Sequence, residues 1–360
     1  MENNKRIIGF DLARAYAILG MYIVNFNIVF GNYDDKSAAG IFLSLFSGNS
    51  STVFVILAGM GLALMTNKTA ANDLEKGRVI RVICKRAFFL IILGLLLMLW
   101  WPADILHFYG LYMLVSVLVL FLQKKYYLWV AAFAIIGFHL LVYFIPFETG
   151  WNFNTLEYKD LWTIKGFARN TFYNGWNALF PWLAYFMTGL YLGRLNWQLD
   201  RTRVKIFYVG MAMYLSVLFT QFLSPLLGAS DDLIYFLNAD YLPPFLPFLV
   251  STTGFGLMLI SFFMYISKNP TQNTLVKALA QTGQMTLTHY VSHLTLGMVI
   301  LGLVTANHYG LEMQKKQPLQ PVYLLLFALA YFAVSYLFTY IWSKKYKQGP
   351  LEMIMRKISG

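Results

Sequence analysis

The chain has 360 residues, of which 58% are hydrophobic and only 12% carry a charge. About a quarter of the residues of a soluble domain are charged, so this composition excludes a soluble enzyme and a disordered chain. The single cysteine, Cys84, excludes an internal disulfide framework and a cysteine metal cluster. The net charge of +12 does not by itself indicate nucleic-acid binding, because in a membrane protein the position of each charge matters more.

Ten apolar segments, separated by polar or Gly- and Pro-rich joints, are predicted to cross the membrane as helices of about 20 residues. Their approximate bounds are 7–30, 50–66, 87–103, 106–122, 127–146, 176–194, 205–227, 246–267, 283–304 and 321–343. Six residues precede the first segment and no small-residue cleavage site follows it, which predicts a retained helix rather than a signal peptide. With no linker and no internal repeat, we expect one domain over residues 1–360.

The basic residues alternate between the two sides of these segments. With the N-terminus inside, 21 of the 28 basic residues fall in inner segments and six in outer ones, while Arg14 alone lies within a span. A wrong helix count would scramble this alternation. The positive-inside rule therefore predicts cytoplasmic N- and C-termini, in a multi-pass protein of the cell membrane surrounded by membrane lipids.

The longest outer loop, residues 147–175, is rich in aromatic residues and asparagine. One interpretation is a lid or a platform for an acceptor. The other, which we favour, is an aromatic belt at the membrane interface.

The first span, FDLARAYAILGMYIVNFN, carries a stripe of polar side chains. Charge inside a membrane span is costly and marks candidate functional residues. Asp11 and Arg14 are three residues apart and can pair on one face, as a functional group or as a structural ion pair. Asn25 follows Arg14 by eleven residues, which returns it to within about 20° of the same face, roughly 16 Å further along the axis.

Four histidines are placed by the sequence. His289 and His293, in MTLTHYVSHLTLG, lie on one face of the ninth span. Imidazole suits general-base chemistry near neutral pH, although a histidine that only bonds a neighbouring helix is an equal alternative, and two ligands alone do not make a metal site. His107 and Asp104, in WPADILHFYG, either orient one another or form a satisfied interfacial pair, and His139 is predicted to be structural.

Two further patterns have simple interpretations. The inner segment NKTAANDLEKGRVIRVICKR contains Arg78 and Arg81. Its positive charge would attract a nucleotide-like anion such as coenzyme A, but it would also attract anionic lipids. The positive-inside rule alone explains most of this positive charge. The glycines of LAGMGLALM and FMTGLYLGR have spacings that favour close helix packing rather than chemistry.

Six segments, in matching order along nearly the whole chain, resemble the transmembrane acyltransferase superfamily. They are RIIGFDLARAYAILGMYIVNFN, GNSSTVFVILAGMGLALM, DILHFYGLYML, ALFPWLAYFMTGLYLGRL, TGQMTLTHYVSHLTLG and GPLEMIMRK. That group includes the bacterial acyltransferase family three, the heparan-glucosaminide acetyltransferases and the uncharacterised YeiB-like proteins, and the first helix and the tail look most like the YeiB-like branch. The resemblance implies a bundle of ten or eleven helices that takes acyl groups from cytoplasmic acyl-coenzyme A and delivers them to acceptors on the far side.

The resemblance also implies roles for the first helix. Acyltransferase family three has an arginine, ten intervening residues and a functional histidine there. Arg14 matches the arginine, but Asn25 stands where the histidine would be. An amide cannot accept a proton at neutral pH, so either another histidine serves or the scaffold has a role without acyl transfer.

We therefore predict an all-α polytopic bundle of about ten transmembrane helices that moves an acyl group from acyl-coenzyme A (acetyl-coenzyme A) to a hydroxyl or amine of an extracytoplasmic glycan or a lipid. Arg14, oriented by Asp11 and helped by Arg78 or Arg81, would hold the anionic donor, with no metal ion involved.

In the same prediction Asn25 would donate a hydrogen bond to the acyl carbonyl as negative charge develops. His293, or else His289, would take the proton of the acceptor. The alternative is a transporter or an exporter of lipids or small molecules, which would use the same polar stripe as a path and transfer no acyl group.

Overall fold

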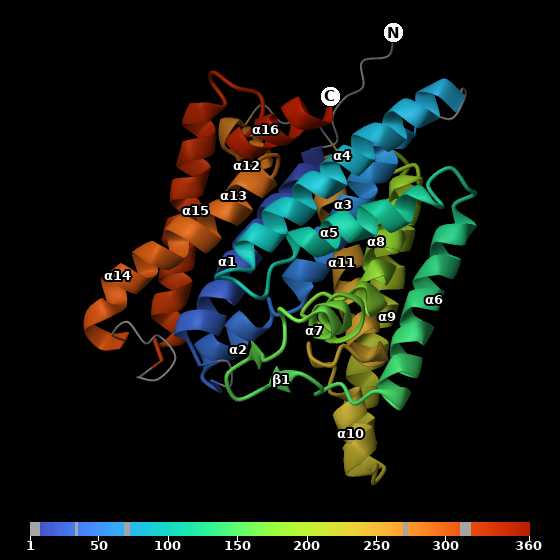
Figure 1. Ribbon diagram of the computed structural model, residues 1–360, viewed down its shortest axis with the longest axis vertical. Coiled ribbons are helices and arrows are strands. Elements are labelled where there is room, and N and C mark those ends of the chain that lie inside the picture. Colours follow the sequence, from blue (N-terminus) through green and yellow to red (C-terminus); the bar gives the residue numbers. More distant parts are fainter. Residues whose placement is uncertain (1–7, 33–34, 68–72, 269–272, 310–317) are drawn as a thin grey trace. The chain divides into compact units, whose positions relative to one another are not determined.

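The computed structural model describes residues 8–32, 35–67, 73–268, 273–309 and 318–360 (Figure 1). Helices form most of this part of the chain, as predicted. The strands described there, β1 (Trp151–Asn152) and β2 (Glu157–Tyr158), make one short antiparallel pair. The helices are α1 (Ile8–Phe30), α2 (Ala38–Ser44), α3 (Asn49–Thr66), α4 (Asp73–Leu97), α5 (Leu106–Val117), α6 (Lys125–Phe144), α7 (Ile164–Arg169), η1 (Asn170–Asn174), α8 (Leu179–Gly193), α9 (Asp200–Leu226), α10 (Asp231–Leu237), α11 (Leu246–Ile266), α12 (Thr274–Thr282), α13 (Thr286–Ser292), η2 (His293–Gly297), α14 (Met298–Tyr309), α15 (Pro321–Trp342) and α16 (Pro350–Ser359).

Within the described residues, seven helical stretches are long and apolar enough to cross a membrane, which supports a multi-pass membrane protein. They are Ile8–Phe30, Ala38–Thr66, Lys125–Phe144, Asp200–Leu226, Leu246–Ile266, Thr286–Thr305 and Pro321–Trp342. The other three predicted spans coincide with α4, α5 and α8, which are helices but lie outside this set. Ten crossings and the cytoplasmic position of both termini therefore stay predictions. Five of the basic residues used for that topology lie outside the described residues: Lys5, Arg6, Lys68, Lys315 and Lys316.

The described chain forms two compact units. Unit 1 consists of Met1–Phe54, Trp197–Met211 and Phe255–Ile354, and unit 2 of Val55–Asn196, Ala212–Gly254 and Met355–Gly360. The single membrane domain stays a prediction.

In unit 1, α1 packs against α12, α13 and α15. The tightest approach is at Gly283, which follows α12, because a Cβ added there would lie 1.8 Å from the backbone oxygen of Asp11. Only glycine fits where two backbones approach this closely. This contact brings the joint between α12 and α13 against the start of α1.

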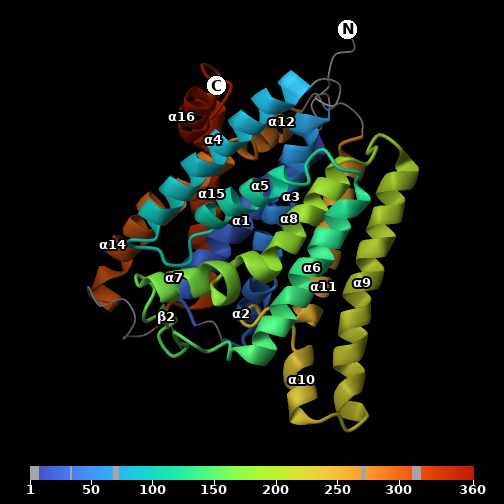
Figure 2. The ribbon, with the colours of Figure 1, turned by 45° about the vertical axis from the view of Figure 1, so that its right-hand side comes forward.

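In unit 2, α4 lies along α5 and α6 along α8, as Figures 1 and 2 both show. The glycines lie at close helix contacts, as predicted. A Cβ on Gly59 of α3 would lie 2.1 Å from the backbone oxygen of Phe186 on α8. A Cβ on Gly189 would likewise meet the oxygen of Ile56 at 2.1 Å. These glycines let the two helix backbones pack in direct contact.

The loop 147–175, which is predicted to lie outside, is a packed substructure of unit 2. Trp151, Tyr158 and Tyr173 are buried in one cluster with Phe138 of α6. This arrangement corrects the aromatic-belt interpretation for these side chains, since a belt would present them to lipid. Trp162, with 61% of its surface exposed, still fits a position at an interface.

Candidate functional site

The candidate site is a contact between two side chains that the sequence had placed on different helices. Asn25 Nδ2 of α1 lies 2.9 Å from Nε2 of His293. His293 is completely buried and Asn25 is half-buried. The local fold explains why the imidazole points this way, since His293 opens η2, a π-helical turn between α13 and α14. Such turns insert an extra residue into a helix and are frequent at functional sites.

The hydrogen bonds of His293 are consistent with one form of its ring. Its Nδ1 lies 3.3 Å from the backbone oxygen of His289, an acceptor, so Nδ1 carries the hydrogen. Nε2 is then an acceptor, and the Asn25 amide donates to it. This assignment follows from the bonding partners rather than from observed hydrogens. In this arrangement His293 is a neutral imidazole whose Nε2 lone pair accepts a hydrogen bond from the amide of Asn25.

The two histidines of the i, i+4 pair have different partners. His289 Nε2 lies 2.8 Å from Oγ1 of Thr339 on α15. His289 therefore bonds a neighbouring helix, which was the structural alternative. His293 alone meets the polar stripe of α1.

Aromatic side chains that the sequence analysis did not single out enclose the imidazole. The ring of Tyr22 lies 4.9 Å and that of Phe26 lies 6.1 Å from the His293 ring, centroid to centroid. The Tyr22 hydroxyl is 3.0 Å from Oγ of Ser335 on α15. Tyr22 could have been found by its spacing, because it precedes Asn25 by three residues and so shares its helix face.

A second polar group lies near the start of α1. Arg14 Nη1 donates to Oδ1 of Asp11 at 2.8 Å, which is the expected pair. Asp11 is buried, whereas Arg14 keeps 23% of its side-chain surface exposed. Gln284, which sequence reasoning missed, donates from Nε2 to the other Asp11 oxygen at 3.0 Å. Because α1 is continuous from Ile8 to Phe30, Arg14 and Asn25 keep their predicted places on one helix face.

The start of α13 is held by Glu352 of α16, another residue that sequence reasoning missed. Its Oε1 accepts hydrogen bonds from the backbone N–H groups of Leu287 (2.7 Å) and Thr288 (3.2 Å), and its Oε2 accepts one from the Thr288 hydroxyl (2.5 Å). The pKa of this carboxyl is raised above its usual value, because the effect of burial is larger than the opposite effect of these hydrogen bonds. Glu352 thus ties the C-terminal helix to the segment that carries both histidines.

The remaining candidates belong to unit 2. His107 Nδ1 lies 3.0 Å from Oδ2 of Asp104, and both side chains are buried. His139 binds the backbone oxygen of Ile135 at 2.9 Å and the backbone N–H of Leu246 at 3.2 Å, in agreement with a structural role.

Arg78 and Arg81 are exposed on α4 of unit 2. Their help to Arg14, which belongs to unit 1, stays a prediction. Among the residues that the structure describes, no three His, Cys, Asp or Glu side chains gather as ligands of a metal ion would.

Two family models match the chain. The one described as heparan-alpha-glucosaminide N-acetyltransferase, catalytic, matches residues 6–221, which is more than half of the sequence. The one described as a protein of unknown function (DUF418) matches residues 192–360. No curated protein and no solved structure was found to match. The first region contains Arg14 and Asn25 and the second contains His293, so the contact between Asn25 and His293 joins the two matched regions.

Proposed function

Because the chain belongs to the family of the heparan-alpha-glucosaminide N-acetyltransferase catalytic domain, we propose that this acetyltransferase-like membrane protein moves an acyl group from acyl-coenzyme A to a hydroxyl or amine. The donor would be cytoplasmic acetyl-coenzyme A or a longer homologue. The acceptor would be a glycan or lipid on the far side of the cell membrane or within it. The observation that carries the proposal is the 2.9 Å contact between Asn25 and His293.

The proposed reaction uses the two side chains in turn. The acceptor oxygen or nitrogen attacks the thioester carbonyl carbon while Nε2 of His293 takes the acceptor's proton. The carbonyl oxygen becomes negatively charged and accepts a hydrogen bond from Nδ2 of Asn25. The carbon–sulfur bond then breaks, and the departing coenzyme A sulfur receives the proton from His293. Each role increases the reaction rate by a known factor. The factor is roughly 10²–10⁴-fold for a general base and roughly 10²–10³-fold for an oxyanion donor.

The surroundings of His293 suit this chemistry. A neutral imidazole with its hydrogen on Nδ1 has the free Nε2 lone pair that a base needs. His293 is completely buried, with the rings of Tyr22 and Phe26 close to its own. Asn25 must leave the imidazole for a substrate to enter between them, and its side chain is only half-buried.

Arg14 is proposed to hold the phosphates of the donor. A guanidinium binds phosphate through paired N–H groups, and Arg14 is partly exposed while Asp11 fixes one end of it. Arg78 and Arg81 would add to the attraction of an anionic donor.

A second function has its own supporting observation. Nε2 of His293 already faces an amide rather than a free space, and the matched second half is described only as of unknown function. A protein that carries a lipid or small molecule along the polar stripe of α1 would need no free base.

The deciding experiment measures release of the coenzyme A thiol from acetyl-coenzyme A by the purified protein in lipid nanodiscs, with a panel of glycan and lipid acceptors. We expect acceptor-dependent release that is lost in His293→Gln and retained in His139→Gln, which removes a histidine elsewhere in the fold. Equal rates for the wild type and His293→Gln would refute the mechanism. Uptake of a small molecule into sealed proteoliposomes without thiol release, lost in His293→Gln, would establish the carrier.

A further inference from the structure

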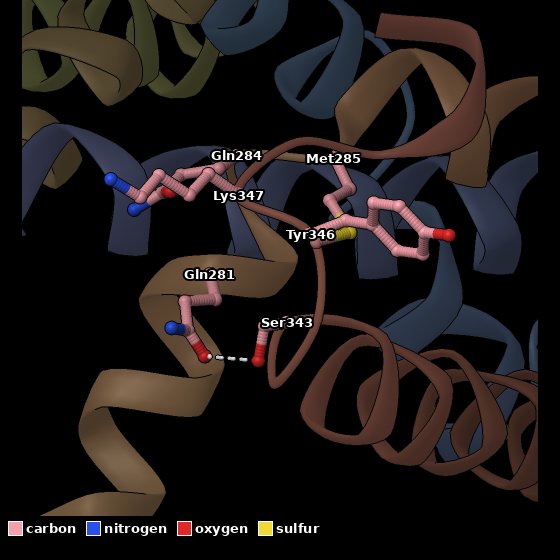
Figure 3. Close-up of a pocket in the computed structure, with 6 residues that line it drawn as sticks. All are labelled: Gln281, Gln284, Met285, Ser343, Tyr346 and Lys347. Atoms are coloured by element: carbon pink, nitrogen blue, oxygen red, sulfur yellow. Dashed lines mark hydrogen bonds between the residues drawn. The ribbon is translucent and has the colours of Figure 1, made fainter. Parts of the chain in front are cut away.

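A polar pocket of about 210 Å³ opens in unit 1, beside the group formed by Asp11 and Arg14. It lies between the joint that links α12 to α13 and the segment that follows α15 (Figure 3). Its lining is Gln281, Gln284, Met285, Ser343, Tyr346 and Lys347.

The lining has two chemically different sides. Figure 3 shows Gln284 and Lys347 extending to one side of the pocket, and Met285 and Tyr346 on the other. The Ser343 hydroxyl donates to Oε1 of Gln281 at 3.1 Å, which fixes that amide and leaves its NH₂ group as the donor for a ligand. The pocket therefore offers N–H donors and an ammonium on one side and a thioether with an aromatic ring on the other.

The charge around the pocket favours an anion. Lys344, Lys345 and Lys347 follow one another within four residues and are all exposed. The nearby carboxylates have hydrogen-bond donors of their own, since Asp11 accepts from Arg14 and Gln284 and Glu352 accepts from the start of α13. No carboxylate belongs to the lining itself.

We propose that this pocket binds a phosphate group, with Lys347 and the Gln281 amide as its donors and Met285 and Tyr346 against the adjoining organic part. Pockets that enclose a whole drug-sized ligand start at about 300 Å³, so this one would hold the end of a larger molecule. Two sources have this chemistry, the nucleotide end of an acyl donor and the headgroup of an anionic lipid. Only the first rests on the proposed function.

One residue connects the pocket to the pair formed by Asp11 and Arg14. Gln284 lines the pocket and also donates to Asp11, whose other oxygen binds Arg14. A ligand that engages Gln284 acts on the same carboxylate that orients Arg14. Occupation of the pocket thereby affects Asp11 and Arg14 in the first turns of α1.

The test measures binding of two probes to the full-length protein by calorimetry: adenosine 3′,5′-bisphosphate, the nucleotide end of coenzyme A, and dihexanoyl-phosphatidylglycerol. The variant is Lys347→Gln, and the matched control is Lys344→Gln, which removes the same charge from a lysine that packs on the ring of Tyr340 outside the pocket. Because hydrogen bonds to charged groups are the strong ones, we expect Lys347→Gln to weaken binding at least about tenfold and Lys344→Gln to change it little.

The outcomes distinguish a nucleotide from a lipid headgroup as the ligand, and they test the pocket separately from the proposed acyl transfer. Binding of the bisphosphate that depends on Lys347 identifies a nucleotide site, and the same dependence for the lipid alone identifies a headgroup site. Equal weakening by both variants, or no binding of either probe, overturns the proposal. Lys347-dependent binding without thiol release refutes only the proposed acyl transfer, whereas thiol release without such binding refutes only the pocket.

Discussion

Nδ2 of Asn25 lies 2.9 Å from Nε2 of His293, although the two residues are 268 positions apart in the sequence. The amide stands where acyltransferases of family three carry a histidine, and the imidazole it contacts comes from another helix. The pair thus contains a hydrogen-bond donor and a base of the kind that the proposed acyl transfer requires, with the base on another element than the first helix, where the resemblance implied it.

Loss of the amide donor should slow transfer without weakening the donor complex. Asn25→Leu removes the group that would bind the developing oxyanion, so we expect kcat to fall roughly 10²–10³-fold. The Kd for acetyl-coenzyme A should stay within about twofold. A variant that retains its kcat would show that Asn25 only holds His293 in place.

The two histidines should respond differently to the same change. His289→Gln breaks the contact with Thr339 and should lower the melting temperature while leaving kcat nearly unchanged. His293→Gln should instead abolish thiol release, because a general base contributes roughly 10²–10⁴-fold. Thr339→Val serves as the companion of His289→Gln, since it removes the other partner of the same bond. Equal loss of kcat in both histidine variants would contradict the separation.

Arg14 should determine donor affinity. Arg14→Ala removes a guanidinium that pairs with Asp11 at 2.8 Å and should weaken acetyl-coenzyme A binding at least about tenfold. The buried carboxylate then loses its cation, so the melting temperature should fall as well. Adding Asp11→Asn should restore stability but not donor binding. Recovery of binding in the double variant would assign Arg14 to the fold alone.

Glu352 should make stability depend on pH. Burial raises the pKa of this carboxyl in the folded protein above 4.5, its usual value. The folded state then favours the protonated form, so the stability that the group contributes is complete below the usual pKa and is lost as pH rises through the raised one. Between pH 4 and 8, the wild type should lose melting temperature relative to Glu352→Gln. A gain with rising pH would mean that the hydrogen bonds from α13 dominate.

The close contact at Gly283 should tolerate no side chain. A Cβ there would lie 1.8 Å from the backbone oxygen of Asp11, so Gly283→Ala should cost about 1–3 kcal/mol through displacement of α1 or the joint. Gly77→Ala is the matched control, because nothing lies within 4 Å of a Cβ at that helical position. It should be neutral or stabilise by up to about 1 kcal/mol. Similar melting temperatures for both variants would contradict the close packing of α1 on this joint.

The amino-acid sequence was enough to predict the class of the protein and its long apolar helices, but not the short helices α2, α7, α10, α12 and α16. Long apolar stretches with few charges have no stable place outside a membrane or a protein core, and each of the ten predicted spans overlaps helical structure. Helical periodicity also fixed which residues share a face of one helix. It placed Arg14 beside Asp11 and put Asn25 on the same stripe, because these relationships depend only on local geometry.

Which helix faces meet depends on tertiary packing. The i, i+4 spacing placed His289 and His293 on one helix face, yet one faces Thr339 and the other faces Asn25. The π-helical turn at His293 shifts the face that it presents, and no periodic pattern predicts such an insertion. Gln284 escaped notice for a related reason, since its partner Asp11 is 273 residues away. Side-chain pairs of this kind depend on how helices pack, and spacing along one helix carries no information about the helix that it will contact.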